Sequence, residues 1–425
     1  RNLRSFPLLV SFSGLPYVDV RVSFNSFIPA DIEDELANKL VNYYTDRLSD
    51  FPNHHDKVEF EIIYSCYTLD LPERLKMLEQ AGFTSAECST LQNSLRKLTN
   101  NIIHDDGLWK KDIQKIDELV ARQDKIMKSD LNDVGKIYWL LEDCKRYGTL
   151  PFAGLARAGF IAVQLLRSLE SVGVLSSLDI EEFMSSLDTV SSAMSVDFNS
   201  LSKDSFLDKY GHLRPGTYDV LSSRYDETPD AYFDWSKRIK LNQSDDAKTK
   251  DFTAGLQTLS KIADLLSFHE LDHDILSFFE FIKRAIEGRE YAKFVFSKSL
   301  SEAMKLYEKV GLNLGFSRED VSFSDIGIVS ELYSSSESAN VTFEHSILRG
   351  KRSYEKTKAV CLPPLITKEV DIFAFELPAG EPNFVTLKAV TANVILNHSE
   401  KTALKGNILM IPSADPGFDW VFSHD

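Results

Sequence analysis

The densest group of side chains capable of chemistry lies between residues 209 and 227 of this 425-residue chain. The stretch reads Lys209-Tyr210-Gly211-His212-Leu213-Arg214-Pro215-Gly216-Thr217-Tyr218-Asp219 and resumes as Ser223-Arg224-Tyr225-Asp226-Glu227. Its glycines and proline disfavour continuous helix, so the sequence predicts a structured loop. Arg214 and Arg224 could hold carboxylate or phosphate oxygens, and we expect His212 to titrate near neutrality as a donor or proton relay. The alternative is that these groups pair with one another and fasten helices together.

A second candidate runs from Gly148 to Phe160, where a glycine and proline turn is predicted to lead into a helix that carries Arg157. Free amides at a helix start favour an anion, and Arg157 lies close enough in sequence to reinforce that attraction. The small residues of this stretch would equally serve close packing between helices. Both interpretations stay open.

A third candidate is His269-Glu270-Leu271-Asp272-His273, because two histidines four residues apart on a helix can share a zinc ion. Asp274, however, is typical of the N-cap of a following helix, so His269 and His273 would straddle a helix break. We therefore expect no metal site here, and a zinc hydrolase is the least favoured function. The chain contains no GxxxxGK(S/T) or GxGxxG phosphate loop and no Gly-x-Ser-x-Gly elbow.

The elements that position these groups begin with a small α+β unit over residues 1–85. Alternating apolar and polar residues at 17–25 predict a half-buried strand, and the apolar run at 58–67 predicts a second strand. Helices are expected at about 32–48 and from Pro72 to about Gln80.

Residues 86–345 are predicted to form a mainly helical middle domain. Helix starts are marked by Asp, Ser or Thr, and helix ends by glycines such as Gly148 and Gly311. The polar stretch 242–250 and the serine-rich stretch 334–338 are expected to be breaks between helices. The predicted helices cover residues 89–101, 111–127, 135–147, 155–171, 180–195, 251–268, 274–286 and 299–310.

The last part, residues 362–425, is predicted to be β-rich, with short strands at 372–375, 384–387, 390–394 and 407–411. About 60 residues are marginal for an independent core, so we expect the start of a domain that is cut short. The predicted fold class is α+β, with a predominantly helical middle domain, a small mixed N-terminal unit and this β-rich C-terminal part.

Composition disfavours several classes of function. A net charge of −16 leaves no surplus of Lys and Arg for neutralising nucleic-acid phosphates. No window approaches the roughly 20 uninterrupted apolar residues that a membrane span requires. The four cysteines lie far apart without a CxxC pair, which predicts reduced and buried thiols in a cytoplasmic protein.

The 211–229 region resembles the central domain of phosphoenolpyruvate-synthase-like phosphotransferases. The resemblance lies in the loop residues quoted above together with Pro229, and a looser version is found in rifampicin phosphotransferases. Gly14-Leu15-Pro16-Tyr17-Val18-Asp19-Val20-Arg21 with Phe24-Asn25-Ser26-Phe27 is similar to the segment that follows the ATP-grasp domain in that group. The stretches 148–157 and 287–293 also look similar to these proteins.

The tail, residues 405–420, resembles the beginning of the swivelling phosphohistidine domain of pyruvate-phosphate-dikinase-type enzymes. It reads Lys405-Gly406-Asn407-Ile408-Leu409-Met410-Ile411-Pro412-Ser413-Ala414-Asp415-Pro416-Gly417-Phe418-Asp419-Trp420. In that family a Gly-Gly-x-x-Ser-His motif follows, whereas this sequence ends at Asp425, and His424 is given no phosphohistidine role. With Arg1 in place of an initiator Met, this predicts an internal fragment that is inactive by itself.

The resemblance implies a relay in three parts. An ATP-grasp domain binds ATP with Mg²⁺, a swivelling domain carries the phosphoryl group on a histidine, and an acceptor domain holds the small molecule that receives it. The acceptor would be pyruvate, an antibiotic hydroxyl, or the amide of glutamine, as in the glutamine kinases of capsule polysaccharide synthesis.

The acceptor pocket implied by the resemblance lies near residues 211–227. His212 or Asp219 would be catalytic, because each could handle the acceptor's proton. The substrate-binding residues would neutralise and orient the acceptor: Arg214, Tyr218, Arg224, Tyr225 and, as a weaker addition, Arg157. The competing hypothesis is a non-catalytic helical interaction module of a degenerate dikinase-like protein.

Overall fold

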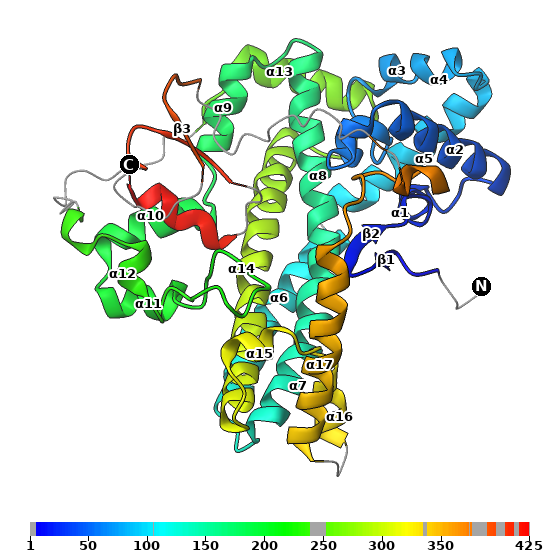
Figure 1. Ribbon diagram of the computed structural model, residues 1–425. Helices are drawn as coiled ribbons and strands as arrows, with labels where there is room; N and C mark the ends of the chain where they lie inside the picture. The colour runs from blue at the N-terminus through cyan, green and yellow to red at the C-terminus, as the bar shows by residue number, and fades with distance from the viewer. Residues whose placement is uncertain are drawn as a thin grey trace.

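The computed structural model describes residues 6–104, 106–238, 252–334, 338–373, 375, 389–396, 404–411 and 416–424. Within these ranges the chain is mostly helical, with one two-stranded sheet near each end, which is consistent with the predicted α+β class. Figure 1 shows two long helices, α8 and α14, side by side at the centre, with the N-terminal helices on one side. The helices α10 to α12 and the C-terminal segment lie on the other side.

The N-terminal unit is a hairpin followed by helices, of which α2 and α5 are the longest. β1 pairs with β2 in antiparallel register, with Phe12 opposite Leu15. In chain order its elements are β1 (Leu9–Phe12), β2 (Leu15–Val18), α1 (Val20–Phe27), α2 (Asp34–Asp50), η1 (Pro52–His54), the π-helical η2 (Val58–Ile62), α3 (Leu71–Arg74), α4 (Lys76–Gln80) and α5 (Ser85–Ile103).

The strand prediction for residues 17–25 is wrong beyond Val18. The Asp19 side chain accepts hydrogen bonds from the main-chain N–H groups of Arg21 and Val22, and this N-cap starts α1. The alternation of apolar residues therefore continues across a strand-to-helix boundary and does not mark one strand.

The strand prediction for residues 58–67 is also wrong. Its first half is the π-helical η2, and the residues that follow are irregular and buried. Here side-chain hydroxyls satisfy main-chain donors in place of a strand ladder: Thr99 accepts from the Tyr67 N–H at 2.8 Å, and Ser168 accepts from the Leu69 N–H at 3.3 Å.

The middle of the chain forms the helical body. Its elements are α6 (Leu108–Met127), α7 (Asp133–Asp143), the π-helical η3 (Cys144–Thr149), α8 (Leu150–Ser171), α9 (Ser177–Ser185), α10 (Val190–Ser200), α11 (Lys203–Tyr210), α12 (Pro229–Tyr232), η4 (Trp235–Lys237), α13 (Leu256–Phe268) and α14 (Ile275–Asn313).

The predicted helices of this body are present, but three of their boundaries are wrong. Residues 274–286 and 299–310 belong to the single helix α14, and Gly311 lies inside it. Residues 180–195 span two helices, α9 and α10. Gly148 ends no helix either, because α7, η3 and α8 follow one another without a break.

The π-helical turn η3 explains how the chain passes Gly148 and Pro151 while staying helical. Proline lacks an N–H donor and its ring clashes with the carbonyl one turn earlier in a regular α-helix. The wider turn of η3 ends where α8 begins, and its closing bond runs from the Leu150 N–H to the Lys145 oxygen. Pro151 then occupies the first turn of α8, where a missing donor is tolerated.

The continuous helical stretch Asp133–Ser171 is long and apolar enough to cross a membrane by length and composition alone. Half of its most apolar window is buried inside the protein. A core helix of a soluble protein passes the same test, and α8 contributes such a helix, with Leu155, Leu165 and Leu169 fully buried.

The C-terminal part contains less strand than expected. Residues 369–372 form a 3-10 helix where a strand was predicted from 372, and the strand predicted at 384–387 lies outside the described residues, as does the predicted loop 242–250. β3 and β4 are parallel and overlap the predictions at 390–394 and 407–411. The remaining elements are α15 (Arg318–Ser322), α16 (Ile328–Ser334), α17 (Ala339–Lys358), η5 (Glu369–Ile372), β3 (Val394–Leu396), β4 (Ile408–Met410) and η7 (Pro416–His424).

Three hydrophobic clusters stabilise the chain. The largest joins the N-terminal unit to α6, α8 and the first half of α14. A second lies between α7, the end of α14 and α15 to α17, and a third between α10, α11, the 211–227 region and the C-terminal segment. Cys66, Cys88 and Cys144 are buried thiols as expected, whereas Cys361 is exposed.

Because α8 and α14 share the largest core, a cavity at their contact should cost much stability. Leu155 of α8 is fully buried, and we expect Leu155→Ala to lower the free energy of unfolding by about 2–5 kcal/mol. Leu150 begins the same helix but is 67% exposed, so Leu150→Ala should change it by less than about 0.5 kcal/mol. Urea denaturation of both variants measures the difference, and equal effects would contradict the assigned packing.

Candidate functional site

The 211–227 loop is irregular, as predicted, and connects α11 to α12 against one side of α14. Its two arms are joined by main-chain hydrogen bonds from Tyr225 N to Leu213 O at 2.9 Å and from Asp226 N to Gly211 O at 3.1 Å. Ser301 of α14 donates to the His212 carbonyl at 2.6 Å. The loop is therefore fixed both internally and to the central helix.

Arg224 is the centre of a buried charge cluster. It is 3% exposed, and its Nε and Nη2 donate to the two carboxylate oxygens of Asp226 at 2.9 and 2.7 Å. Nη2 also lies 2.8 Å from Glu302 Oε1 on α14. Two carboxylates thus neutralise this guanidinium, a paired arrangement that a buried charge requires.

Arg214 holds the opposite arm of the loop. It is 2% exposed, and its Nη1 donates to the Asp219 carbonyl at 3.2 Å while Nη2 donates to Ser301 Oγ at 3.4 Å. Ser301 therefore contacts both Arg214 and the carbonyl of His212. Because Arg214 is buried and bonded to groups of the protein, it holds the loop in shape.

His212 does not titrate near neutrality, contrary to the expectation from its residue type. The ring is 3% exposed and packs edge-on against Phe294, with centroids 4.8 Å apart. Burial, together with the nearby charges of Lys298 and Arg224, lowers the pKa of His212 to about 3. Neither ring nitrogen makes a hydrogen bond of standard geometry, although the main-chain groups of Phe294 and Lys209 oppose the pKa shift weakly. The imidazole is neutral at pH 7, and its low pKa makes it a weak proton acceptor there.

The remaining loop candidates divide between surface and interior. Tyr218 is 70% exposed, and the Asp219 side chain is exposed and accepts from the Leu221 N–H at 2.8 Å. Tyr225 is fully buried, and its hydroxyl donates to the Gly417 carbonyl at 2.7 Å. The fold thus brings His212, Arg214 and Arg224 together in the interior and leaves Tyr218 and Asp219 at the surface.

The C-terminal η7 lies directly on this loop, a contact that the sequence did not reveal. A side chain at Gly417 would collide with the carbonyl of Arg214 and the nitrogen of Pro215. Trp420 is 2% exposed and packs edge-on against Tyr232, with centroids 5.7 Å apart. The close approach explains why glycine stands at 417.

Asp419 fastens the same segment to α10 and α14. Its carboxylate accepts from Ser191 Oγ at 2.8 Å. Burial raises the pKa of Asp419 to about 6, with the Ser191 hydrogen bond and the Lys293 charge opposing the shift. Burial and the nearby Asp419 charge likewise raise the pKa of Glu290. Two carboxyl groups with raised pKa values therefore face each other at this contact.

Arg157 lies on α8, and its neighbours belong to the N-terminal unit. Its guanidinium sits 5.5 Å from the centroid of Phe27, and burial lowers its pKa. Of the two interpretations left open for this stretch, the anion site at a helix start lacks its free amides, because α8 continues from η3 and presents no free first turn at residue 150. Any contact that Arg157 makes with an anion therefore depends on its own side chain.

The histidine pair in residues 269–273 straddles a helix break, as expected. His269 ends α13, and its Nδ1 lies 2.7 Å from the Tyr67 hydroxyl. His273 precedes α14, and Asp274 caps that helix through the N–H groups of Leu276 and Ser277. No group of three or more potential metal-ligating His, Cys, Asp or Glu side chains occurs among the residues that the structure describes.

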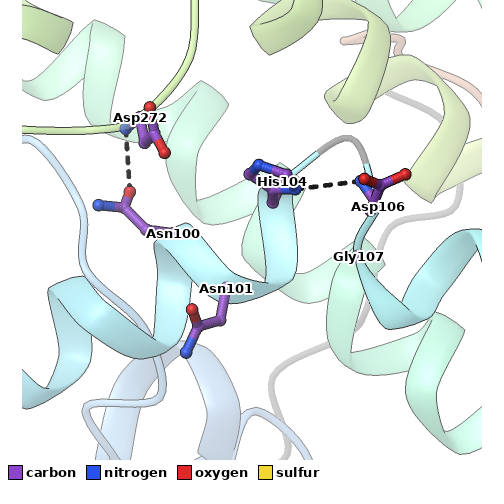
Figure 2. A pocket seen from close by; sticks show the side chains of 6 residues that line it. All are labelled: Asn100, Asn101, His104, Asp106, Gly107 and Asp272. Atoms are coloured by element: carbon purple, nitrogen blue, oxygen red, sulfur yellow. Dashed lines mark hydrogen bonds between the residues drawn. The ribbon is translucent and has the colours of Figure 1, made fainter.

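A polar pocket of about 300 Å³ lies at the end of α5 and contains none of the predicted site residues. Figure 2 shows Asn100 accepting from the Asp272 main chain and His104 accepting from the Asp106 main chain. Some polar groups of the pocket thus hold the turn after α5 and the segment before α14 in place.

Comparison of the chain with protein-family models, curated proteins and solved structures gives no match.

The Arg224 cluster should stabilise the loop strongly, because removing the cation leaves the Asp226 and Glu302 carboxylates facing each other, with the more distant Lys305 beside Asp226 at 3.7 Å. We expect Arg224→Ala to lower the free energy of unfolding by about 3 kcal/mol or more. Arg146 also pairs with a carboxylate but is 64% exposed, so Arg146→Ala should cost no more than about 0.5 kcal/mol. Chemical denaturation measures both; a loss below about 1 kcal/mol for Arg224→Ala would argue against the buried cluster.

The raised pKa of Asp419 predicts a defined dependence of stability on pH. An acid whose folded pKa exceeds its unfolded value of 3.8 stabilises the fold fully below pH 4 and loses that contribution as pH rises through about 6. Asp419→Asn keeps an oxygen for Ser191, and its free energy of unfolding should therefore equal that of the wild type at pH 4. At pH 7 the free energy of unfolding of the variant should exceed that of the wild type by on the order of 2 kcal/mol.

Denaturation of the two proteins across this pH range provides the measurement. His212 contributes the opposite slope in both proteins, since its lowered pKa favours folding at higher pH. The difference between the two curves therefore removes the His212 contribution and reports on Asp419 together with its effect on Glu290. A difference that stays constant from pH 4 to 7 would show that the carboxyl group titrates normally.

Proposed function

We propose that this chain is the acceptor-binding part of an ATP-dependent phosphotransferase that relays a phosphoryl group through a phosphohistidine to a small acceptor. An ATP-grasp domain, using ATP and Mg²⁺, and the rest of a swivelling domain would belong to the same parent chain. The acceptor would be pyruvate, the amide of glutamine or a similar small molecule, and the proposed location is cytoplasmic.

The observation that carries the proposal is the contact between the two segments whose resemblance is most specific. The 211–227 loop and η7 are 192 residues apart at the hydrogen bond from Tyr225 to Gly417. They nevertheless meet closely, with Gly417 against the Arg214 main chain and Trp420 in the aromatic cluster of the loop. Segments that resemble the acceptor domain and the start of the carrier domain thus form one packed unit.

This contact suits a carrier that must visit two sites. A swivelling domain needs a fixed point from which its later residues swing, and each site must exclude water during its own half-reaction. With η7 fixed by Tyr225 and Ser191, residues after 424 would turn about a point beside the loop. The loop would therefore position the carrier as well as the acceptor.

The burial of the loop assigns different roles to its residues under this proposal. Arg214 and Arg224 would position the loop, because both are almost fully buried and bonded within the protein. Tyr218 and Asp219 are exposed and would face the acceptor, with the Asp219 carboxylate taking its proton. Tyr225 would hold the carrier segment.

The first test uses the complete parent protein with ATP labelled separately at the β- and γ-phosphates, followed by mass spectrometry of the protein. A phosphohistidine labelled from the β position is the expected result. It would lead directly to a screen of carboxylate, amide and sugar acceptors. No covalent label from either position would contradict the proposal.

A matched pair of variants in the same protein tests the role of the contact. Gly417→Val should displace η7 from Arg214 and reduce phosphoryl transfer to the acceptor at least about tenfold, while histidine phosphorylation by ATP continues. Gly255→Ala is the control, because nothing lies within 4 Å of a side chain added there. Equal acceptor turnover in both variants would show that phosphoryl transfer does not require the contact between η7 and the loop.

A second candidate function is a non-catalytic helical interaction module. The ion pairs of Arg224 with Asp226 and Glu302 favour this alternative, because these side chains bind one another inside the protein. A parent chain without the downstream histidine motif, together with the absence of a covalent label, would support this alternative.

A further inference from the structure

Two arginines on the central helices stay unpaired in a chain rich in carboxylates. Arg157 on α8 and Arg289 on α14 are both partly buried, and the Nε of each is buried without a hydrogen-bond partner. Neither guanidinium forms an ion pair or hydrogen bond with any residue that the structure describes. Arg224 and Arg284, by contrast, each pair with a carboxylate at 2.7–2.8 Å.

Arg289 reaches across to α8 close to the turn that carries Arg157. The aliphatic stem of Arg289 crosses α8 at Gly159, where an added Cβ would lie 3.2 Å from Arg289 Cδ. The guanidinium then sits 5.5 Å from the centroid of Phe160. Arg157 is one turn before Phe160 on the same face of the helix, since residues three apart are neighbours there.

Aromatic rings form the walls around these charges. Arg157 lies 5.5 Å from the centroid of Phe27, and Phe60 meets Phe160 edge to face at 5.5 Å. Arg167, two further turns along α8, stacks over Phe60 at 5.0 Å. A cation gains some energy over a ring face, but the ring accepts none of the directed N–H bonds that a guanidinium can donate.

Burying part of an unpaired guanidinium is unfavourable, so the absence of a partner for Arg157 and Arg289 among the described residues needs an explanation. Removing a guanidinium from water without a partner is unfavourable, and proteins normally place a carboxylate beside it. This chain has 64 Asp and Glu residues against 48 Lys and Arg. Glu290 senses the charge of Arg289, yet it interacts with the Val190 main chain and faces Asp419. The positive charges of Arg157 and Arg289 on this face of α8 are thus not neutralised by an ion pair within the described part of the chain.

We propose that Arg157 and Arg289 form a binding site for the oxyanion of a small molecule, a phosphate or a carboxylate, between the rings of Phe27 and Phe160. The planar fork of each guanidinium matches two oxygens of such a group, and a bound anion would supply the hydrogen-bond acceptors that each Nε lacks. The inference does not depend on the proposed phosphotransferase function, because an oxyanion site here could also serve a binding protein.

The test is isothermal titration calorimetry of the full-length protein with inorganic phosphate and, separately, with pyruvate at constant ionic strength. Arg157→Met and Arg289→Met keep most of the aliphatic stem and remove the charge. We expect each to weaken binding about tenfold or more, since a charge-assisted pair of hydrogen bonds is lost. Arg284→Met is the matched control on α14, because Arg284 is exposed and already paired with Glu280.

Thermal unfolding without added anion separates binding from a structural role. An arginine retained for a ligand should be removable with little change in the unfolding midpoint, because its burial is unfavourable when the site is empty. Arg157→Lys and Arg289→Lys, which keep charge but lose the fork, should bind with intermediate affinity. These variants give the answer if a methionine variant fails to fold.

The outcomes are decisive in either direction. Binding of phosphate but not pyruvate, or the reverse, supports the site and identifies the kind of oxyanion. Absence of saturable binding of both probes at millimolar concentration overturns the proposal. Binding that Arg157→Met and Arg289→Met leave unchanged overturns it too. A phosphohistidine label in the parent protein tests the proposed function alone, so the two proposals can fail separately.

Discussion

The burial of α14 along most of its length is the constraint on which the other parts of this structure depend. A helix of 39 residues spans roughly 58 Å, and it could not be stable alone with so many apolar side chains in water. Its first half packs on α8 in the largest hydrophobic cluster, and its last turns pack on α15 to α17. Serines at 297, 299 and 301 are buried along the middle of the helix, where bulkier side chains would keep neighbours at a distance.

The buried serine at 301 shows how this helix also organises the polar loop. Ser301 bonds to both the His212 carbonyl and Arg214, while Glu302, the next residue, pairs with Arg224. The loop therefore replaces its hydration with partners inside the protein, and Ser301 and Glu302 of α14 are two of them. The same loop then supplies the surface on which η7 rests. The position of α14 therefore fixes the loop, and the loop in turn fixes η7.

Two kinds of arginine environment result from this packing. In the loop, burial is compensated by carboxylates and carbonyls, so the charges stabilise structure. On the face of α8, burial is only partial, and aromatic rings take the place of anions, so the positive charge is left for another group. Residue type alone does not distinguish these cases, since both sets have the same guanidinium. The distinction lies in which neighbours the tertiary structure supplies.

The local sequence pattern by itself determined the helical body, the N-cap at Asp274 and the irregular loop at 211–227, because these features depend on neighbours a few residues apart. It misassigned residues 17–25 and 58–67, where an N-cap at Asp19 and hydroxyls from distant helices decide the local backbone. Only the tertiary structure decided that His212 is neutral, that η7 covers the loop, and that Arg289 reaches Gly159 and Phe160 on α8. Desolvation and long-range contacts act between residues far apart in the chain, and no local pattern encodes them.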